Sequence, residues 1–349
     1  MTAMMRALVK TQKGPGFLEL RDVPEPSPGP GEVLIEVKAC GICGTDLHVW
    51  HDRFPYWPPV TLGHEFSGQI VAAGPETGLF KAGDRVVGEP HTRACGHCYL
   101  CRTGNIQICP LKRSPGWGID GAFAKYLKMP ERLLHRIPDS MSYELAAVVE
   151  PTANAVHDVV ERARVNAGDF VVVLGPGPIG LLAALTARAA GARHVVIVGT
   201  PADEALRLKK ARELGFGTVI NVAQQDPVKT VQELTGGLGA DLVIECSGAP
   251  AAIASTVELI RKKGRICVIG LTGKDSIPFP WDKAAFKVCD VVFNLSTSYT
   301  SWDRTIHLIA SGQLPAGEII TRRAPLLEWQ RAFEDIEAKL ALKVLLIPE

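Results

Sequence analysis

The pattern of hydrophobic and polar positions differs between two parts of the chain. In the first part, short segments alternate with a period of two, as in the EVLIEVK segment at residues 32–38, whose branched apolar residues share one face. Clusters of proline and glycine, such as residues 23–31, separate these segments and mark loops. We therefore expect residues 1–153 to form a mostly β domain.

From about residue 154, short and fully apolar runs replace this alternation. Phe170–Leu174 and His194–Val198 are examples, and each precedes a segment of helical composition. Such runs are typical of parallel strands that are buried on both faces. Because strand and helix signals continue to alternate, we expect a doubly wound parallel sheet over residues 154–293, an α/β fold. Residues 294–349 are expected to return to the first domain.

Composition and charge are those of a globular protein with more than one core. The chain has 349 residues, of which 46% are hydrophobic and 21% charged. Lysine and arginine are scattered and the formal net charge is +1, so nucleic acid is not an expected partner. The most apolar region, residues 170–198, is interrupted by glycine, proline and arginine and does not predict a membrane span. The start of the chain lacks the apolar stretch of a signal peptide, which favours a cytoplasmic location.

Four of the nine cysteines lie within fifteen residues, with the spacing C-x2-C-x2-C-x7-C. A tetrahedral site of four thiolates needs ligands this close in sequence, and such a site is closed and structural. A ferredoxin-type iron–sulfur run begins with the same spacing, but its fourth cysteine comes earlier. Buried or redox-labile thiols are the remaining alternative. We expect a structural zinc site, with the ligands Cys95, Cys98, Cys101 and Cys109.

A second set of metal-binding residue types lies on either side of this run. Cys43 follows the alternating strand, His64 and Glu65 follow a proline-rich loop, and Glu150 closes the β part. Cysteine, histidine and carboxylate together form a mixed site of the kind used where zinc must also hold a substrate oxygen. Each of these residues is a weak signal by itself.

A glycine-rich loop follows both sets of ligands. Gly175, Gly177 and Gly180 form the pattern G-x-G-x-x-G between a buried apolar run and a helical segment. In that context the pattern predicts a dinucleotide whose pyrophosphate lies at a helix N-terminus. A tight strand–helix turn without a ligand is the alternative.

Together these motifs resemble the zinc-dependent medium-chain dehydrogenase/reductase family, and most of all its polyol (sorbitol) and threonine dehydrogenase branch. The matching segments are GICGTDLH at 41–48, GHEFSG at 63–68, AGDRV at 82–86, the four-cysteine run, EPTANAVH at 150–157 and GPGPIG at 175–180. The resemblance implies a GroES-like catalytic domain, a Rossmann domain that binds NAD or NADP, and two zinc ions per chain. It also implies hydride transfer between the cofactor and a secondary alcohol or ketone, and a homodimer or homotetramer.

The resemblance assigns roles to the second ligand set. Cys43 and His64 would bind the catalytic zinc directly. Glu65 would be a further ligand, or one that exchanges with substrate or water. Glu150 would reach the metal directly or through a water. Asp46 would orient the zinc-binding histidine.

Thr45 and His48 would form the relay that carries the proton of the alcohol to solvent. Zinc lowers the pKa of bound water to about 7 and is expected to act similarly on a bound alcohol. The resulting alkoxide donates hydride to the nicotinamide ring. The expected substrate is a polyol, a sugar alcohol or an amino alcohol such as L-threonine.

The cofactor contacts that the resemblance implies lie in the glycine loop and at the ends of later strands. They are Gly175, Gly177, Pro178, Ile179, Gly180, Gly199, Thr200, Arg207, Ile269 and Gly270. An acid usually ends the second strand and binds the ribose 2′-hydroxyl of NAD. Here GTP stands at 199–201, with Asp203 and Glu204 following. The Gly-Thr pair resembles the Gly-Ser pair of NADP-dependent relatives, although Pro201 stands where those relatives have an arginine. Arg207 can add charge, but NAD-using relatives also carry an arginine at the matching helix position. On balance these features favour NADP or dual use. An aspartate at Gly199 is then expected to shift the preference toward NAD.

Two departures separate the chain from sorbitol dehydrogenases. Val49 and Trp50 stand where that branch has an aromatic residue after its GTDLH-like motif, and the arginine that binds polyol hydroxyls has no clear match. Trp50, Trp117 and Tyr299 are candidates for a pocket lining or for ordinary packing. A zinc-free quinone reductase of the same fold and a non-enzymatic zinc-binding module are the alternatives. The cysteine run argues against the first, and the nucleotide loop against the second.

Overall fold

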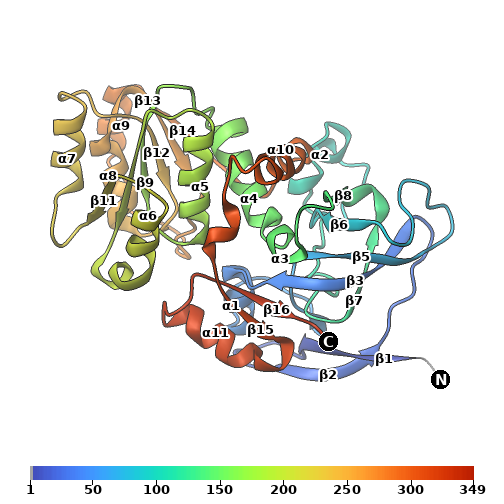
Figure 1. Cartoon of the computed structure of the whole chain (residues 1–349). Helices are drawn as coiled ribbons and strands as arrows, with labels where there is room; N and C mark the ends of the chain where they lie inside the picture. The colour runs from blue at the N-terminus through green and yellow to red at the C-terminus, as the bar shows by residue number, and fades with distance from the viewer. Residues whose placement is uncertain (1–2) are drawn as a thin grey trace. The chain divides into compact units, whose positions relative to one another are not determined.

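The computed structural model describes residues 3–349, which fold into two compact units (Figure 1). The first unit comprises Met1–Glu150, Ser298–Ala310 and Ile320–Glu349, and the second comprises Pro151–Thr297 and Ser311–Ile319. The chain therefore returns to the first unit after Thr297. A short segment then belongs to the second unit again before the chain ends in the first.

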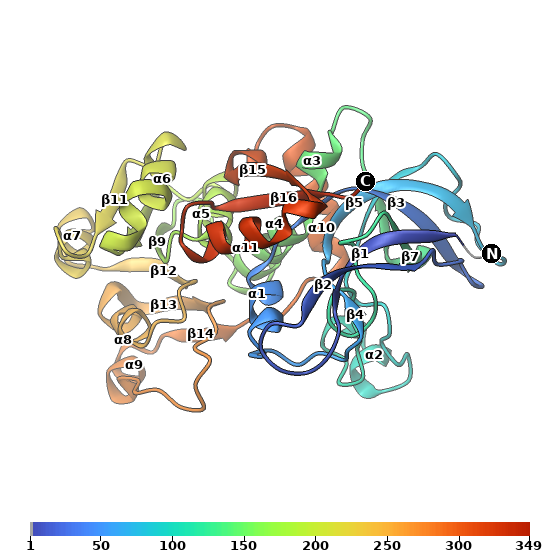
Figure 2. The same cartoon turned by 90° about the horizontal axis from the view of Figure 1, so that it is seen from below.

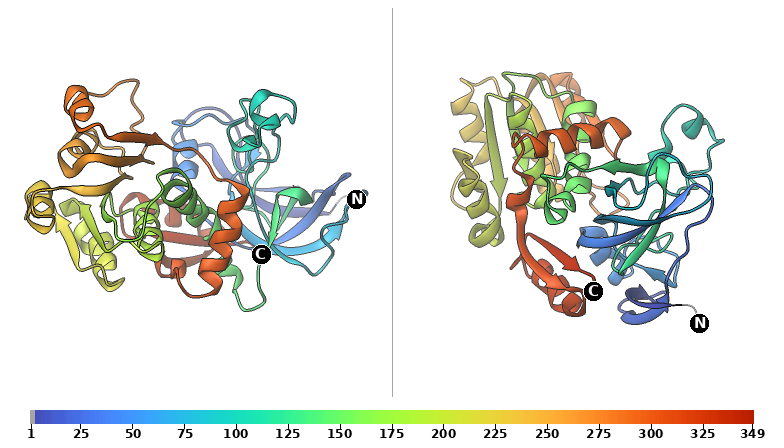
Figure 3. Two further views of the ribbon diagram at one scale, coloured as in Figure 1. Left: turned by 90° about the horizontal axis from the view of Figure 1, so that it is seen from above. Right: turned by 45° about the vertical axis from the view of Figure 1, so that its right-hand side comes forward.

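Antiparallel strands make up most of the first unit, as the alternating pattern predicts. A small sheet has the order β2-β1-β4, and a larger one has the order β15-β16-β3-β5-β6-β8, with β7 also paired to β3. The strands are β1 (Met4–Lys10), β2 (Leu18–Pro24), β3 (Glu32–Gly41), β4 (Val60–Thr61), β5 (Glu65–Ala73), β6 (Arg85–Gly88), β7 (Tyr126–Pro130), β8 (Leu134–Arg136), β15 (Ile320–Pro325) and β16 (Lys343–Ile347). Strand β16 lies beside β3 although the two come from opposite ends of the chain (Figures 2 and 3).

Strand β3 links the sequence pattern to the site. Val33, Ile35 and Val37 are buried on one face, as the alternation predicts. Beyond them the strand is buried on both faces as it passes beneath the predicted zinc ligands. Its antiparallel register with β5 places Gly41 opposite Glu65, so that two segments far apart in sequence meet there.

Helices connect these strands. They are α1 (Gly44–Trp50), α2 (Tyr99–Arg102), α3 (Tyr143–Ala146), α10 (Tyr299–Ala310) and α11 (Trp329–Glu337), with the 3-10 turns η1 (Ile106–Ile108), η2 (Glu131–Leu133) and η7 (Leu326–Glu328). Of these, α3 and α11 pack against strands of the larger sheet. The helix α4 (Val149–Val156) contains the boundary between the units. No helix within residues 3–349 is both long enough and apolar enough to span a bilayer.

The second unit is the predicted doubly wound sheet. Its six strands are all parallel and have the order β11-β10-β9-β12-β13-β14. They are β9 (Phe170–Leu174), β10 (His194–Gly199), β11 (Thr218–Asn221), β12 (Ala240–Glu245), β13 (Ile260–Val268) and β14 (Asp290–Phe293). The helical segments are η3 (His157–Arg162), α5 (Pro178–Ala189), η4 (Pro201–Asp203), η5 (Glu204–Leu208), α6 (Lys209–Glu213), α7 (Pro227–Leu234), α8 (Pro250–Leu259), α9 (Trp281–Lys287) and η6 (Ala316–Ile319).

Helices cover both faces of this sheet, which explains the fully apolar runs. Val172, Val196 and Val243 pack with residues of α7, α8 and α9 in one core cluster. The alternate residues of β9 are buried as well, and α5 packs on β9, β10 and β12 (Figure 1). A strand of such a sheet has no solvent side, so polar positions do not interrupt it.

Residue composition predicts helices at residues 205–214 and 251–260, and both have different bounds in the structure. The helix expected at 205–214 begins as the π-helical segment η5 and continues as α6. The helix expected at 251–260 ends at Leu259, because Ile260 is already the first residue of β13. Boundaries of this kind depend on strand pairing, which a local apolar pattern does not contain.

Candidate metal centres and nucleotide site

Three predicted ligands of the catalytic zinc converge in the first unit. Cys43 Sγ, a ring nitrogen of His64 and a carboxylate oxygen of Glu65 lie within 4.8 Å of one another. Cys43 is the residue before α1, His64 precedes β5, and Glu65 begins β5 opposite Gly41. His64 and Glu65 are buried, so the cluster is shielded from solvent except at the Cys43 thiol, which is partly exposed. Sulfur, nitrogen and oxygen donors in one buried cluster fit a zinc ion.

The pKa of His64 reflects the charged groups around it in this cluster. Burial lowers its pKa, but Asp46 and Cys43 outweigh burial and raise the pKa to about 10. Glu150 also raises it, which places that carboxylate near the cluster although it lies outside the three-residue group. A histidine binds metal only as the neutral imidazole, so metal binding at this site releases a proton.

Asp46 lies behind His64, as expected of an orienting carboxylate. Its Oδ2 accepts a hydrogen bond of 2.9 Å from the backbone N–H of Cys43, and its Oδ1 lies 3.7 Å from His64 Nδ1. Asp46 Oδ1 and His64 Nδ1 are both buried, and neither atom has a hydrogen-bond partner in the described part of the chain, residues 3–349. A slight turn of the ring closes this gap and leaves Nε2 for a metal, which is how carboxylates fix zinc-binding histidines. Trp117 packs edge-on against the same ring, with centroids 4.8 Å apart.

Lys343 is a site residue that sequence reasoning missed. Its Nζ donates to both carboxylate oxygens of Glu65, at 2.8 and 2.7 Å, and to the carbonyl of Ile42 at 2.9 Å. Both side chains are buried. Burial opposes the charge on Lys343, yet Glu65 outweighs it and the pKa of the lysine is raised. The sequence places this lysine at the start of the last apolar run, but that pattern does not indicate which residue the lysine contacts.

The two expected relay residues lie on α1. Thr45 and His48 are three positions apart, and that spacing puts them on the same side of a helix. Thr45 is half-buried and His48 is exposed. Burial lowers the pKa of His48, with a further decrease from Arg53 and His51, so the ring releases a proton readily.

The four clustered cysteines have the geometry of a closed tetrahedral site. Their sulfur atoms all lie within 4.8 Å of one another, and two Sγ–Sγ distances are 3.9 Å. Four thiolates at the usual zinc–sulfur distance would be about 3.8 Å apart, whereas a disulfide needs about 2.05 Å. Backbone N–H groups of Cys95, Cys98 and Cys101 point at sulfur atoms of the cluster. The N–H of Cys95 lowers the pKa of Cys109 to about 6, which favours the thiolate. This and the catalytic cluster are the two such groups within residues 3–349.

Cys98→Ala tests the structural role of the cysteine cluster. Structural zinc contributes folding energy directly, so we expect a lower melting temperature and the loss of one zinc per chain. Thermal unfolding and elemental analysis measure these two effects. Cys289→Ala is the matched control, because Cys289 belongs to neither ligand group. Unchanged stability with unchanged zinc content would contradict the assignment.

The glycine loop has the shape of a phosphate cradle. Gly175 follows β9 with φ +99°, a conformation that favours glycine. A Cβ at Gly180 would lie 1.9 Å from the carbonyl oxygen of Gly175, so this glycine permits close packing of α5 on the strand. Gly177, before Pro178 at the start of α5, has open space where its Cβ would be. The start of α5 therefore has free space beside Gly177, where a pyrophosphate is expected to lie.

Gly199 is closely surrounded in the structure. A Cβ built on Gly199 lies 2.8 Å from atoms of both Leu208 and Pro176. Leu208 is met at the end of a flexible side chain and Pro176 at its ring, so an aspartate here requires a local shift of these neighbours. The expected effect of this substitution on cofactor preference stays a prediction.

The loop after β10 has few free groups for the ribose. Asp203 accepts hydrogen bonds from the N–H and hydroxyl of Thr200, at 3.0 and 2.6 Å, and pairs with Arg207 at 3.2 Å. Glu204 accepts from Arg212 and Asn221. Neither acid is oriented as a ribose acceptor. Arg207 Nε is buried and has no hydrogen-bond partner within residues 3–349, so this side chain has a donor that is not used there.

Ile269 and Gly270 follow β13 directly. Both N–H groups donate to the carbonyl oxygen of Glu245 at 2.9 Å. The carboxylate of Glu245 accepts in turn from the N–H groups of Ser247 and Gly248. Sequence reasoning missed Glu245, although it is a buried acid at the end of the apolar strand β12. It fixes the two loops that lie beside the phosphate cradle at the carboxyl edge of the sheet.

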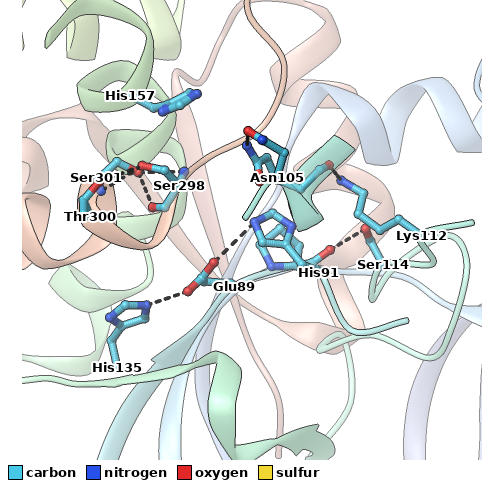
Figure 4. A network of polar contacts seen from close by, with 12 residues as sticks. Glu89, His91, Asn105, Lys112, Ser114, His135, His157, Ser298, Thr300 and Ser301 are labelled. Atoms are coloured by element: carbon cyan, nitrogen blue, oxygen red, sulfur yellow. Dashed lines mark hydrogen bonds and ion pairs between the residues drawn. The ribbon is translucent and has the colours of Figure 1, made fainter. Parts of the chain in front are cut away.

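A second buried polar network lies in the first unit (Figure 4). Glu89 stands between His91 and His135, at 3.4 and 3.0 Å, and His135 also pairs with Asp303 of α10 at 3.0 Å. Trp302 stacks on His135 with centroids 5.5 Å apart. The network joins the ends of β6 and β8 to α10 and fixes that returning helix in the first unit.

The three aromatic candidates differ in their surroundings. Trp50 packs at near right angles on Trp329 and Phe333, which is core packing between α1 and α11. Tyr299 is exposed and lies against His135. Of the three, Trp117 is the one in contact with a predicted zinc ligand.

Comparison with known proteins gives two family models that match along the chain. Residues 29–139 match the alcohol dehydrogenase GroES-like domain, and residues 178–311 match the zinc-binding dehydrogenase domain. The chain is 40% identical to sorbitol dehydrogenase of Halalkalibacterium halodurans, over 99% of both chains. It is 37% identical to L-threonine 3-dehydrogenase of Bacillus licheniformis, over the whole of both chains. A zinc-binding dehydrogenase from Sinorhizobium meliloti, solved with NADP, superimposes with a TM-score of 0.92 at 32% identity, covering 99% of this chain and 100% of that one.

Proposed function

We propose a function on the premise that this chain belongs to the zinc-dependent alcohol dehydrogenase family. It is an NAD(P)-dependent enzyme that transfers hydride between the cofactor and an alcohol or the corresponding carbonyl compound. The observation that carries the proposal is the convergence of Cys43, His64 and Glu65 in a chain that also has an open phosphate cradle. We propose the polyol and amino alcohol class as substrates, since the relatives named above act on sorbitol and threonine.

The proposed metal site uses this chain's own residues as follows. Cys43 and His64 hold the catalytic zinc, and Glu65 and Glu150 complete the site directly or through water. Zinc, when bound, polarises the substrate oxygen and favours ionisation of the alcohol. Asp46 holds the His64 ring in the orientation that presents Nε2 to the metal.

The proton of the alcohol leaves through α1 in this proposal. The Thr45 hydroxyl accepts it, and His48, on the same side of the helix, passes it to solvent. The lowered pKa of His48 suits this step, because a ring that binds protons weakly returns them to water near neutral pH. The relay keeps bulk water away from the reacting carbon.

A substrate panel with both cofactors tests the proposal. Sorbitol, other polyols, vicinal diols and L-threonine are each assayed with NAD and with NADP by nicotinamide absorbance. We expect turnover of at least one of these alcohols and its loss on removal of zinc by a chelator. Turnover of quinones that survives chelation would instead indicate a zinc-independent reductase of the same fold.

Arg207 is the residue on which we expect cofactor preference to depend. We propose that it faces the ribose and favours NADP, because its Nε has no partner while Asp203 holds the rest of the guanidinium in place. Arg207→Leu should lower the NADP/NAD ratio of kcat/KM by at least about tenfold, which needs only about 1.4 kcal/mol of differential binding. Arg212→Leu, which removes an exposed arginine paired with Glu204, is the control. A ratio that is the same in both variants would contradict this role.

We also propose that the chain forms a homodimer or homotetramer, through the edge strand β14. Phe293 is 71% exposed and lies on a strand whose outer backbone groups are unpaired by any other strand. The neighbouring Trp281, Phe286 and Leu295 are exposed as well. A long exposed apolar edge is normally covered, and a second copy of β14 can pair with it antiparallel.

Phe293→Asp is expected to convert the oligomer to monomers. A carboxylate at position 293, the last residue of β14, would be desolvated by a second copy. Analytical ultracentrifugation or light scattering measures the mass. Leu238→Asp, at an equally exposed leucine after α7, should leave the mass unchanged. An unchanged oligomer in Phe293→Asp would exclude β14 as the interface.

We propose the cytoplasm as the location of the protein. Two ligand sets in this chain need free thiolates, and a reducing compartment keeps them available. All nine cysteines are free thiols in the structure.

A further inference from the structure

A fully buried lysine lies at the carboxyl end of α1 and has no role in the mechanism above. Lys10 is the last residue of β1, and its side chain is 0% exposed. A lysine is rarely buried to this extent unless its charge is paired. Within residues 3–349, its ammonium group contacts carbonyl oxygens and aromatic rings rather than a carboxylate.

The ammonium group of Lys10 donates to three carbonyl oxygens. They belong to Gly14, Gly16 and Trp50, the last at 3.2 Å. An ammonium group has three protons, so this set uses all of its donors. The ring of Tyr56 lies 5.1 Å from the nitrogen atom and covers the group from another side. The surroundings of Lys10 are therefore complete without a ligand, and its effect must come through the groups that it binds.

One of these groups belongs to the helix that carries the proposed proton relay. Trp50 is the last residue of α1, and Thr45 and His48 precede it on the same helix. Carbonyl groups in a last helical turn have no partner within the helix, and the helix dipole attracts a cation to that end. Here the Trp50 carbonyl oxygen accepts from Lys10 and from the N–H of Gly16, the latter at 2.8 Å. The loop between β1 and β2 therefore holds the end of the relay helix.

The same loop also holds the turn that follows α1. Asp52 has φ +60°, a left-handed conformation that residues other than glycine adopt infrequently. Its carboxylate accepts a hydrogen bond of 2.7 Å from the hydroxyl of Tyr56, and this hydroxyl accepts one of 3.0 Å from the N–H of Gly14. Gly14 is thus bonded to both Lys10 and Tyr56. The carboxyl end of α1 is fixed from two sides.

The amino end of α1 is fixed to the metal centre. Cys43, the residue before the helix, is a proposed zinc ligand, and its N–H donates to Asp46 in the first turn at 2.9 Å. Thr45 and His48 lie between this anchor and the one at Lys10. Their position relative to the substrate therefore depends on both ends of the helix.

We propose that Lys10 is a positioning residue for proton transfer. It holds the carboxyl end of α1 so that His48 lies where it passes the proton of the alcohol to solvent. Lys10 itself neither touches the substrate nor exchanges a proton. A displacement of about 1 Å can cost about a hundredfold in rate, so a small movement of this helix is sufficient. This inference rests on the proposed function, because it requires the relay of Thr45 and His48.

Lys10→Met is the first test, because it keeps most of the apolar stem and removes the ammonium group. We expect kcat for alcohol oxidation to fall by at least about tenfold, the lower range of what a positioned acid or base contributes. High concentrations of HEPES, at constant pH and ionic strength, should raise this kcat again by at least about threefold, because a dissolved base then takes up the proton. His48→Ala is the reference and should respond to HEPES in the same way.

Ile70→Ala is the control for lost stability. Ile70 is buried on β5 in the core of the first unit and makes none of the contacts described for Lys10. Its truncation should lower the melting temperature, and its kcat per zinc-loaded chain should not respond to HEPES. The same behaviour in Lys10→Met would show a purely structural role and would overturn the proposal.

Amide hydrogen exchange, measured without substrate, gives a second readout that is independent of turnover. In Lys10→Met, the amides of residues 48–53 should exchange at least about tenfold faster than in the parent protein, because the end of α1 opens more often. The amides of α5, in the second unit, should exchange as in the parent. Unchanged exchange at residues 48–53 would contradict the proposal.

His48→Ala separates failure of this inference from failure of the proposed function. If the parent oxidises no alcohol of the panel, or if His48→Ala keeps full activity, the proposed function or its relay is wrong, and this inference is overturned with it. If HEPES restores His48→Ala but not Lys10→Met, the relay stands and the role of Lys10 alone is overturned. If Lys10→Met does not fold, Tyr56→Phe decides the question, because it releases the same turn while keeping the ring. A kcat of Tyr56→Phe that equals the parent value and ignores HEPES would then overturn the proposal.

Discussion

Cys43→Ala is expected to lower kcat by at least about a thousandfold, because a metal that polarises the substrate oxygen contributes several kcal/mol to transition-state stabilisation. Cys43 is the thiolate of the three-residue cluster with His64 and Glu65, and its loss leaves a nitrogen and a carboxylate to hold the ion. The dissociation constant for NADPH should change little, since the phosphate cradle lies in the second unit.

Cys40→Ala is the matched control for this experiment. Cys40 lies three residues earlier, is fully buried in the core of the first unit, and belongs to neither ligand group. Its replacement should lower stability modestly and leave zinc content and kcat close to those of the parent. Zinc content that falls from two ions to one per chain in Cys43→Ala, with intact nucleotide binding, would support the site as assigned. Full activity in a variant that has lost that zinc would exclude a metal-dependent mechanism.

The sequence predicted best those features whose information is local. The four clustered cysteines and the glycine loop are each read within about fifteen residues, and the structure brings the cysteines together and leaves the loop open. Cys43 and His64 are farther apart, and the residues alone gave only a weak signal for them. The family resemblance grouped them, and the register of β3 with β5 is the physical reason that they meet.

Features that depend on pairing between distant segments could not be predicted. Lys343 and Glu65 are 278 residues apart, and no periodicity in either segment indicates their contact. The network of Glu89 and His135 likewise needs the fold to be known, because it joins two strand ends to α10. The close packing around Gly199 likewise could not be predicted. Its sequence context suggests a cofactor determinant, and only the structure shows that Leu208 and Pro176 leave little room there for a larger side chain.

The fold itself was predictable where burial sets the residue pattern. Fully apolar runs gave the strands of the parallel sheet, and alternation gave β3. Short strands such as β6 and β8 were not predicted, because three or four residues are too few to show a period of two. Their existence depends on β5 and on one another through antiparallel pairing.

Lys343→Met is expected to lower the free energy of unfolding by about 3–5 kcal/mol, the usual cost of leaving one partner of a buried ion pair uncompensated. Both oxygens of Glu65 depend on this ammonium, and each side chain is at most 4% exposed. Urea denaturation measures the loss. Lys283→Met breaks an exposed pair with Glu258 and should cost less than about 1 kcal/mol.

The pH dependence and a double variant separate this ion pair from a simple loss of packing. The pKa of Lys343 is raised above the usual lysine value of 10.5, so its stabilising charge is complete below that value and is lost only as pH rises through the higher folded-state value. The loss in free energy of unfolding caused by Lys343→Met should therefore be constant between about pH 6 and pH 9. Combining it with Glu65→Gln removes the stranded charge, and the double variant should be more stable than Lys343→Met alone. If instead the two losses simply add, the lysine contributes through its aliphatic stem, and the charge pair at the edge of the zinc site does not hold Glu65 in place.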